Sequence, residues 1–168
     1  GDTNGDGFND LLIGALDYDE NEVVDVGAAY LVLGDSLGWT ENRSLDQAEL
    51  IMIGHLENDS VGQYLGGLGD INGDGNHDFG VSAHGHDLIA NNSGALYGIL
   101  GGTLSGTIYL EESASFVVLG AGSGDAIGKG IAAAGDTNGD GLDDFWVTGT
   151  GAGSTGTVYL LNGTLSPP

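Results

Sequence analysis

A nine-residue acidic loop occurs three times in this chain and limits what the chain can fold into. The copies read DTNGDGFND, DINGDGNHD and DTNGDGLDD, and they begin at Asp2, Asp70 and Asp136. These starts are 68 and 66 residues apart in a chain of 168 residues. A motif that returns at a nearly constant spacing is typical of a repeat array, in which each copy builds one supersecondary unit.

Each copy of the loop has oxygen-bearing side chains at positions 1, 3, 5 and 9 and a glycine at position 6. Calcium takes such oxygen ligands on flexible loops, whereas magnesium demands strict octahedral geometry and keeps its waters. The glycine allows the positive φ of a tight turn. We therefore predict three Ca²⁺ sites, each with the backbone carbonyl of position 7 as a further ligand. The predicted ligands are Asp2, Asn4, Asp6, Phe8 carbonyl and Asp10; Asp70, Asn72, Asp74, Asn76 carbonyl and Asp78; and Asp136, Asn138, Asp140, Leu142 carbonyl and Asp144.

Two other loop types have similar sequences. An EF-hand needs a bidentate Glu at position 12 and a helix after the loop. Position 12 here is Ile13, Val81 or Val147, each inside an apolar run, which excludes the EF-hand. A metal-free hairpin rich in Asp and Asn is the remaining alternative. Three carboxylates within nine residues would repel one another in such a hairpin, and every copy keeps all the ligand positions.

Short apolar runs bounded by Gly, Asp and Asn separate the loops, and they are rich in β-branched and aromatic residues, as strands are. We predict a first strand from the D-x-[VI]-G segments at Asp59 and Asp125, three further strands after each of the first two loops, and two after the third loop. A four-stranded unit of this kind is typical of a β-propeller blade, so we expect an all-β fold of antiparallel blades with metal-bound hairpins. The later strands are predicted at 11–16, 79–84 and 145–150, then 27–34, 94–101 and 156–163, then 50–54 and 116–120.

The order and spacing of these elements resemble the FG-GAP repeat of integrin alpha-subunit propellers and of many bacterial surface proteins. Val61-Gly62 and Ile127-Gly128 stand in the "FG" place, followed by the acidic loops, and Ile13 to Leu16 stand in the "GAP" place. The chain departs from the pattern because Val or Ile replaces the Phe and the Pro is absent. The resemblance implies propeller blades.

The repeat divides the chain into three units. Residues 1–58 form a repeat without its first strand, residues 59–124 a complete repeat, and residues 125–168 a repeat without its fourth strand. Propellers close with about 4–8 blades, and open strand edges are avoided in proteins. We therefore expect further repeats of a parent chain, or self-association of copies end to end, to complete the blades.

The composition excludes several classes of partner. The chain has 2 Lys+Arg against 25 Asp+Glu, a formal charge of -23, which disfavours nucleic acid and anionic membranes. Apolar residues make up 40%, enough for a packed core, and no apolar run is long enough for membrane insertion. The chain has no Cys, so it offers neither disulfides nor thiol chemistry.

Four N-x-S/T sequons begin at Asn42, Asn58, Asn91 and Asn162. Such sequons are acceptors for N-glycosylation in secreted proteins, although they also arise by coincidence in chains rich in Asn, Ser and Thr. With the acidic loops, which suit the high calcium concentration outside cells, they favour an extracellular or cell-surface location.

These features predict a non-catalytic, calcium-stabilised structural or adhesion module, either a unit of a surface fibre or part of a larger propeller, which binds a protein or glycan ligand. One alternative is an accessory domain of a secreted enzyme. Its candidate residues are His55, His77, His84 and His86, of which only the last two are close in sequence. A second alternative is a carbohydrate-binding module that stacks sugars on Trp39, Trp146 and tyrosines.

Overall fold

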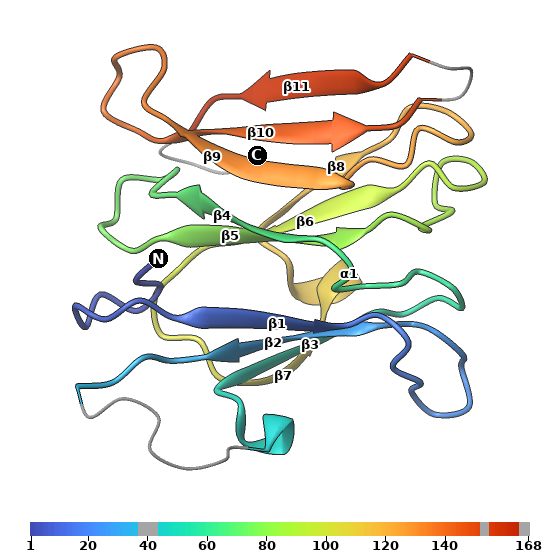
Figure 1. Cartoon of the computed structure of the whole chain (residues 1–168), viewed down its shortest axis with the longest axis horizontal. Coiled ribbons are helices and arrows are strands. Elements are labelled where there is room, and N and C mark those ends of the chain that lie inside the picture. The colour runs from blue at the N-terminus through green and yellow to red at the C-terminus, as the bar shows by residue number, and fades with distance from the viewer. Residues whose placement is uncertain (37–43, 152–154, 165–168) are drawn as a thin grey trace.

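The computed structural model describes residues 1–36, 44–151 and 155–164, whose strands form three sheets. The sheets are stacked as three layers in the order of the chain (Figure 1). Helical structure in the described part is limited to two short segments, the 3₁₀ turn η1 (Leu45–Gln47) and the helix α1 (Leu110–Ser113). The predicted all-β class is therefore confirmed, and the largely antiparallel sheets agree with propeller-like blades.

The strands of each sheet are neighbours in a nearly sequential order. The first sheet has the order β1-β2-β3-β7, the second β4-β5-β6-β8 and the third β11-β10-β9. The strand bounds are β1 (Leu11–Ala15), β2 (Ala28–Val32), β3 (Leu50–Ile53), β4 (Leu65–Gly69), β5 (Asp78–Ala83), β6 (Ala95–Ile99), β7 (Gly106–Tyr109), β8 (Phe116–Leu119), β9 (Gly130–Gly135), β10 (Asp144–Gly149) and β11 (Thr157–Leu161).

Apolar side chains fill the two spaces between the sheets. The strands β2, β5 and β6, each of which has a strand on both edges, are buried along their whole length. One core cluster joins the first and second sheets through Leu50, Met52 and Phe79, and it includes Leu110 of α1. A second cluster joins Leu68 and Leu96 of the second sheet to Phe145 and Val147 of the third.

The D-x-[VI]-G segments are not strands, contrary to the prediction. The first strands begin later, at Leu65 and Gly130. Positive φ angles at Ser60 and Gly62, and at their counterparts in the third repeat, interrupt the extended backbone. The segments instead form single parallel bridges to the preceding sheet, between Val61 and Gly27 and between Ile127 and Gly94. They therefore join one layer to the next.

Strand β7 and helix α1 were not predicted from the sequence. Residues of β7 leave the second repeat and pair with β3 of the first sheet in parallel, with Leu50 opposite Gly106 and Ile53 opposite Tyr109. This pair is the exception to the expected antiparallel blade. The segment between 101 and 116 is short and half polar, so it gave no clear strand pattern.

The predicted repeat boundaries, 58/59 and 124/125, fall between strands of different sheets. The crossing of β7 into the first sheet means that 59–124 is interleaved with its neighbour rather than separate. No helix in the described residues has the length and apolar character needed to span a membrane.

Candidate metal loops

The first acidic loop is organised around the carboxylate of its first residue. Asp2 accepts hydrogen bonds from the backbone N–H groups of Gly5 at 2.8 Å, Asp6 at 3.2 Å and Gly7 at 2.8 Å. Asp6 in turn accepts the N–H of Phe8 at 2.9 Å. These bonds curl the loop backbone around the Asp2 carboxylate.

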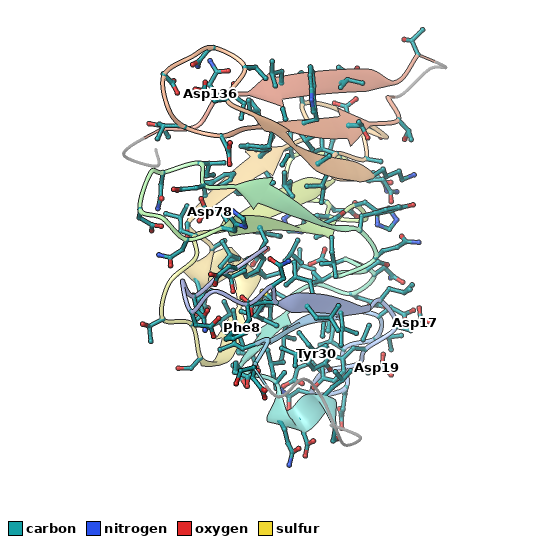
Figure 2. The ribbon with its side chains drawn as sticks, turned by 60° about the vertical axis from the view of Figure 1, so that its left-hand side comes forward. Phe8, Asp17, Asp19, Tyr30, Asp78 and Asp136 are labelled. Carbon is teal, nitrogen blue, oxygen red and sulfur yellow. The ribbon has the colours of Figure 1, made fainter. Side chains whose placement is uncertain are left out.

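The second and third loops repeat this pattern. Asp70 and Asp136 each accept the N–H groups of positions 4, 5 and 6, and Asp74 and Asp140 accept the N–H of position 7. Glycine at position 6 has a φ of 91° in all three loops, as predicted. Labelled residues of the three loops, Phe8, Asp78 and Asp136, lie toward one end of the layers in Figure 2, opposite Asp17 and Asp19.

The loop hydrogen bonds influence the acidity of the ligand candidates. Burial raises the pKa of Asp2, but the N–H groups of Gly7, Gly5 and Asp6 outweigh burial and hold the pKa below its ordinary value. The same balance lowers the pKa of Asp74, where burial is opposed by the Asn72 amide and the Asn76 N–H. Both side chains are therefore carboxylates at neutral pH, the form that binds a cation.

The side-chain amide nitrogen of the asparagine at position 3 donates a hydrogen bond to the aspartate at position 5. The amide nitrogen of Asn4 lies 2.9 Å from Asp6 Oδ2, and the same contact occurs between Asn72 and Asp74 and in the third loop. Its amide oxygen accepts the N–H of position 5. An amide oxygen has two lone pairs, so one remains for the predicted role of this oxygen as a ligand.

The aspartate at position 9 ties the loop to the sheet. Asp10 accepts the N–H and hydroxyl of Thr3 through Oδ2, and the N–H of Gly34, after β2, at 2.9 Å through Oδ1. Asp144 makes the same bonds with Thr137 and with Gly163, after β11. The Thr137 hydroxyl lowers the pKa of Asp144, burial raises it, and the N–H donors lower it further, so the net pKa is below the ordinary value.

The middle loop differs because Ile71 replaces the threonine at position 2. Asp78 accepts the N–H groups of Ile71 and Gly101 but has no hydroxyl donor from position 2. Burial therefore dominates, and with the nearby charges of Asp74 and Asp70 it raises the pKa of Asp78 to about 6. The pKa of Asp78 is thus shifted in the opposite direction from that of Asp144 in the third loop.

The role of position 8 was not predicted from the sequence. His77 donates its backbone N–H to the Asp2 carbonyl at 2.8 Å, and Nδ1 of its ring accepts the Asp2 N–H at 3.1 Å. Asp143 makes the equivalent pair of contacts with Asp70, at 3.0 and 2.9 Å. Each loop is therefore bound to the next across two layers. The signal was present, because Asn9, His77 and Asp143 all carry an acceptor.

The loops fit a hard cation in donor chemistry, although their side chains are not gathered into a ready cluster. Across residues 1–36, 44–151 and 155–164, no three His, Cys, Asp or Glu side chains are grouped as a metal site. The cause is visible in the hydrogen bonds above, which turn the carboxylates toward backbone N–H groups. A carboxylate has about four lone-pair positions, so these bonds leave acceptor capacity for a cation.

A second polar group is buried beside the end of β5. His86 is fully buried, and its Nδ1 lies 3.0 Å from Oδ1 of Asp59. Nε2 is 3.5 Å from Oε1 of Glu111 on α1, and it has no hydrogen bond within the described structure. The Asp59 hydrogen bond raises the pKa of His86, burial lowers it, and the carboxylates of Asp59, Glu111 and Asp87 raise it, for a net increase.

The other histidines do not gather with His86. His84 is half-buried and its ring packs edge-on against Tyr64, whereas His55 packs edge-on against Tyr109. Burial lowers the pKa of His84, and the Lys129 charge lowers it further. The four histidines considered for an enzyme therefore occupy separate environments.

Three of the four sequon asparagines are described, and Asn58, Asn91 and Asn162 are exposed. Asn42 and Trp39 lie outside the described residues. Trp146 is 39% exposed on the outer face of the third sheet, where Leu160 and Val158 lie beside it on β11. This face is apolar and has no fourth layer against it in the described structure.

The chain is similar to part of an integrin alpha chain. No protein-family model matches the sequence. Integrin alpha-PS2 of Drosophila melanogaster is 42% identical over 86 residues, which are 49% of this chain and 6% of the integrin. The chain therefore corresponds to a small part of that protein's length. The match supports a relationship to integrin alpha chains over about half of the sequence.

Proposed function

We propose that this protein is a calcium-stabilised, non-catalytic module that works in adhesion or surface structure outside the cell. The observation that carries the proposal is the hydrogen-bond pattern at positions 1 and 5 that three acidic loops on three stacked sheets share. The partial similarity to an integrin alpha chain agrees with a surface role. In this proposal the sheets are FG-GAP blades of a larger propeller or of a surface fibre.

The residues that would hold calcium are those at positions 1, 3, 5 and 9 of each loop, with the position-7 carbonyl. When bound, calcium would neutralise carboxylates that otherwise repel one another. The chain itself supplies the connection to the fold, because position 9 bonds both the loop and the end of a neighbouring strand. Position 8 joins successive loops. Stiffening one loop would therefore stiffen the end of the whole stack.

Calcium titration tests this proposal. Binding to the folded state adds about 2.7 kcal/mol per site at a hundredfold excess over Kd. We expect a chelator to lower the melting temperature strongly, calcium to restore it, and magnesium at the same concentration to restore it poorly. A melting curve that is the same with calcium and with chelator would contradict the proposal.

A carbohydrate-binding role is the second candidate, supported by the exposed Trp146 ring. An exposed aromatic side chain such as that of Trp146 is able to stack on a sugar. A glycan array with wild-type protein and with Trp146→Ala separates the two candidates. Saturable binding to a glycan that is lost in the variant would favour the sugar-binding role.

A further inference from the structure

Strands β3 and β8 occupy equivalent places in the first and second sheets, but their surroundings differ. Each pairs with the Gly-x-x-Tyr strand of its own sheet, with Ile53 opposite Ala28 and Leu119 opposite Ala95. The outer edge of β3 is covered by β7 in parallel pairing. No strand in the described part of the chain pairs with the outer edge of β8.

The missing cover shows in the burial of equivalent side chains. Leu50 and Met52 of β3 are 1% and 0% exposed. Their counterparts Phe116 and Val118 of β8 are only half-buried, and Val117 is 46% exposed. An apolar groove of about 220 Å³ lies here, between the second and third sheets. Its walls include Phe116, Val118 and Leu100 of the second repeat and Phe145 and Leu161 of the third.

Within the described residues, the outward backbone groups of β8 have no strand partner at this edge. Gly120, just after β8, donates its N–H to the carbonyl of Gly94, just before β6. Backbone groups of successive residues in a strand point to opposite edges, so the N–H groups of Phe116 and Val118 also point toward β6. The N–H and C=O groups of Val117 and Leu119 then point away from the sheet. In the first sheet the equivalent groups of β3 face β7.

The segment that covers β3 is an uncharged strand followed by a buried leucine. It starts at Leu104, continues as the uncharged strand β7 and turns into α1 at Leu110. Leu110 is 1% exposed and belongs to the core between the first two sheets, where Leu104, Ile108 and Ala114 also pack. The segment therefore has two parts: a strand that forms a parallel pair with β3, and the apolar side chain of Leu110, which fills the space between the layers.

We propose that the free edge of β8 and its groove are the docking site for a second strand-and-leucine segment, with the chemistry of residues 104–114, from a neighbouring repeat. The segment pairs with β8 in parallel and places a leucine in the groove. This deepens the proposed role as a unit of a repeat array, because it names the segment through which a neighbouring repeat is held. Extended peptides bind exposed sheet edges in this manner, with backbone bonds for affinity and pockets for side chains.

A labelled peptide with the sequence of residues 104–114 tests the proposal on the whole chain. Fluorescence anisotropy measures binding, and hydrogen exchange reports the amides of Val117 and Leu119. We expect saturable binding with slowed exchange at both amides. The same peptide with Ile108→Asp and Leu110→Asp should not bind, because a charge would enter the apolar groove.

The matched protein variants are Val117→Pro and Val117→Thr. Proline removes the outward N–H at an edge position where the sheet tolerates it, whereas threonine keeps the N–H and the β-branched shape. We expect Val117→Pro to weaken binding about tenfold or more, and Val117→Thr to bind within about twofold of wild type. Circular dichroism checks that both variants fold, and the peptide variants test the groove independently if the proline variant does not.

Three results would overturn the proposal. The first is no protection of Val117 and Leu119 at about 1 mM peptide, the weak limit for a specific site. The second is equal binding by Val117→Pro and wild type. The third is hydrogen exchange showing that the amides of Val117 and Leu119 are already protected in the monomeric chain without peptide. The peptide experiment is run both with calcium and with chelator. Peptide binding that is absent in both conditions contradicts the docking site, whereas the calcium proposal is judged separately from the melting curves.

Discussion

At the scale of single residues, the loop ligands and their neighbours should respond differently to mutation. Asp6→Ala removes a candidate ligand and the acceptor of the Phe8 N–H, so calorimetry should show two bound calcium ions instead of three. Phe8→Ala is the matched control, because position 7 is predicted to offer only its backbone carbonyl. Loss of a site in the Phe8 variant, or three sites in the Asp6 variant, would contradict the ligand assignment.

A pH dependence is expected from His86, which lies between Asp59 and Glu111. Its pKa is raised in the folded state, so the folded state binds the proton more tightly than the unfolded chain does. The resulting stability is fully present below the unfolded histidine pKa of about 6.5 and is lost as pH rises through the higher folded pKa.

The measurement is urea unfolding of wild type and His86→Gln at a series of pH values from below the unfolded histidine pKa upward. Chelator is present so that calcium binding does not contribute. The difference in unfolding free energy between wild type and variant should be largest at the acidic end and shrink toward pH 8. His55→Gln is the control, since that side chain is exposed and bonds no carboxylate in the described structure. A difference that is constant with pH would show that His86 stays neutral.

At the scale of elements, the side chain of Leu110 should hold β7 on the first sheet. Leu110→Ala leaves a cavity between two layers and should lower the free energy of unfolding by about 2–5 kcal/mol. In this variant, hydrogen exchange relative to wild type should speed up more at the β7 amides than at the amides of β1 and β2. Leu88→Ala, at a side chain that is 61% exposed, should change stability by less than about 0.5 kcal/mol. Equal effects of the two variants would contradict this role.

The elements also show what the sequence was able to predict. Strands with clear boundaries, such as β2 and β5, were located because apolar runs ended at Gly or Asp. The D-x-[VI]-G segments were assigned wrongly, since residue type does not reveal the positive φ of Ser60 or Ala126. Strand β7 was missed because its pairing with β3 is a contact between distant parts of the chain.

The loops show the same limit. Their ligand pattern was readable, because each chemical group is local to nine residues. The bonds from position 9 to Gly34 and from position 8 to the preceding loop depend on how layers stack. The high pKa of Asp78 follows from burial and from the nearby charges of Asp74 and Asp70, and burial is not a property of the local sequence.

At the scale of the whole molecule, the outer face of the third sheet should drive self-association. Trp146, Val158 and Leu160 are exposed on that face, and the inner faces of the layers are packed by similar side chains. Exposed apolar faces and open strand edges recruit further strands. The formal charge of -23 opposes contact between copies, and bound calcium would reduce that repulsion.

We therefore expect the 168-residue chain to associate end to end in millimolar calcium, with the third sheet of one copy against the first-sheet end of the next. Light scattering should show a mass that rises with protein concentration and falls when chelator is added. Leu160→Lys should reduce the association, because it places a charge on the contacting face. Leu88→Lys should not, since it adds the same charge in the connection between β5 and β6, away from that face. A folded monomer at every concentration, or equal effects of the two lysines, would show that neighbouring repeats are not held through this face.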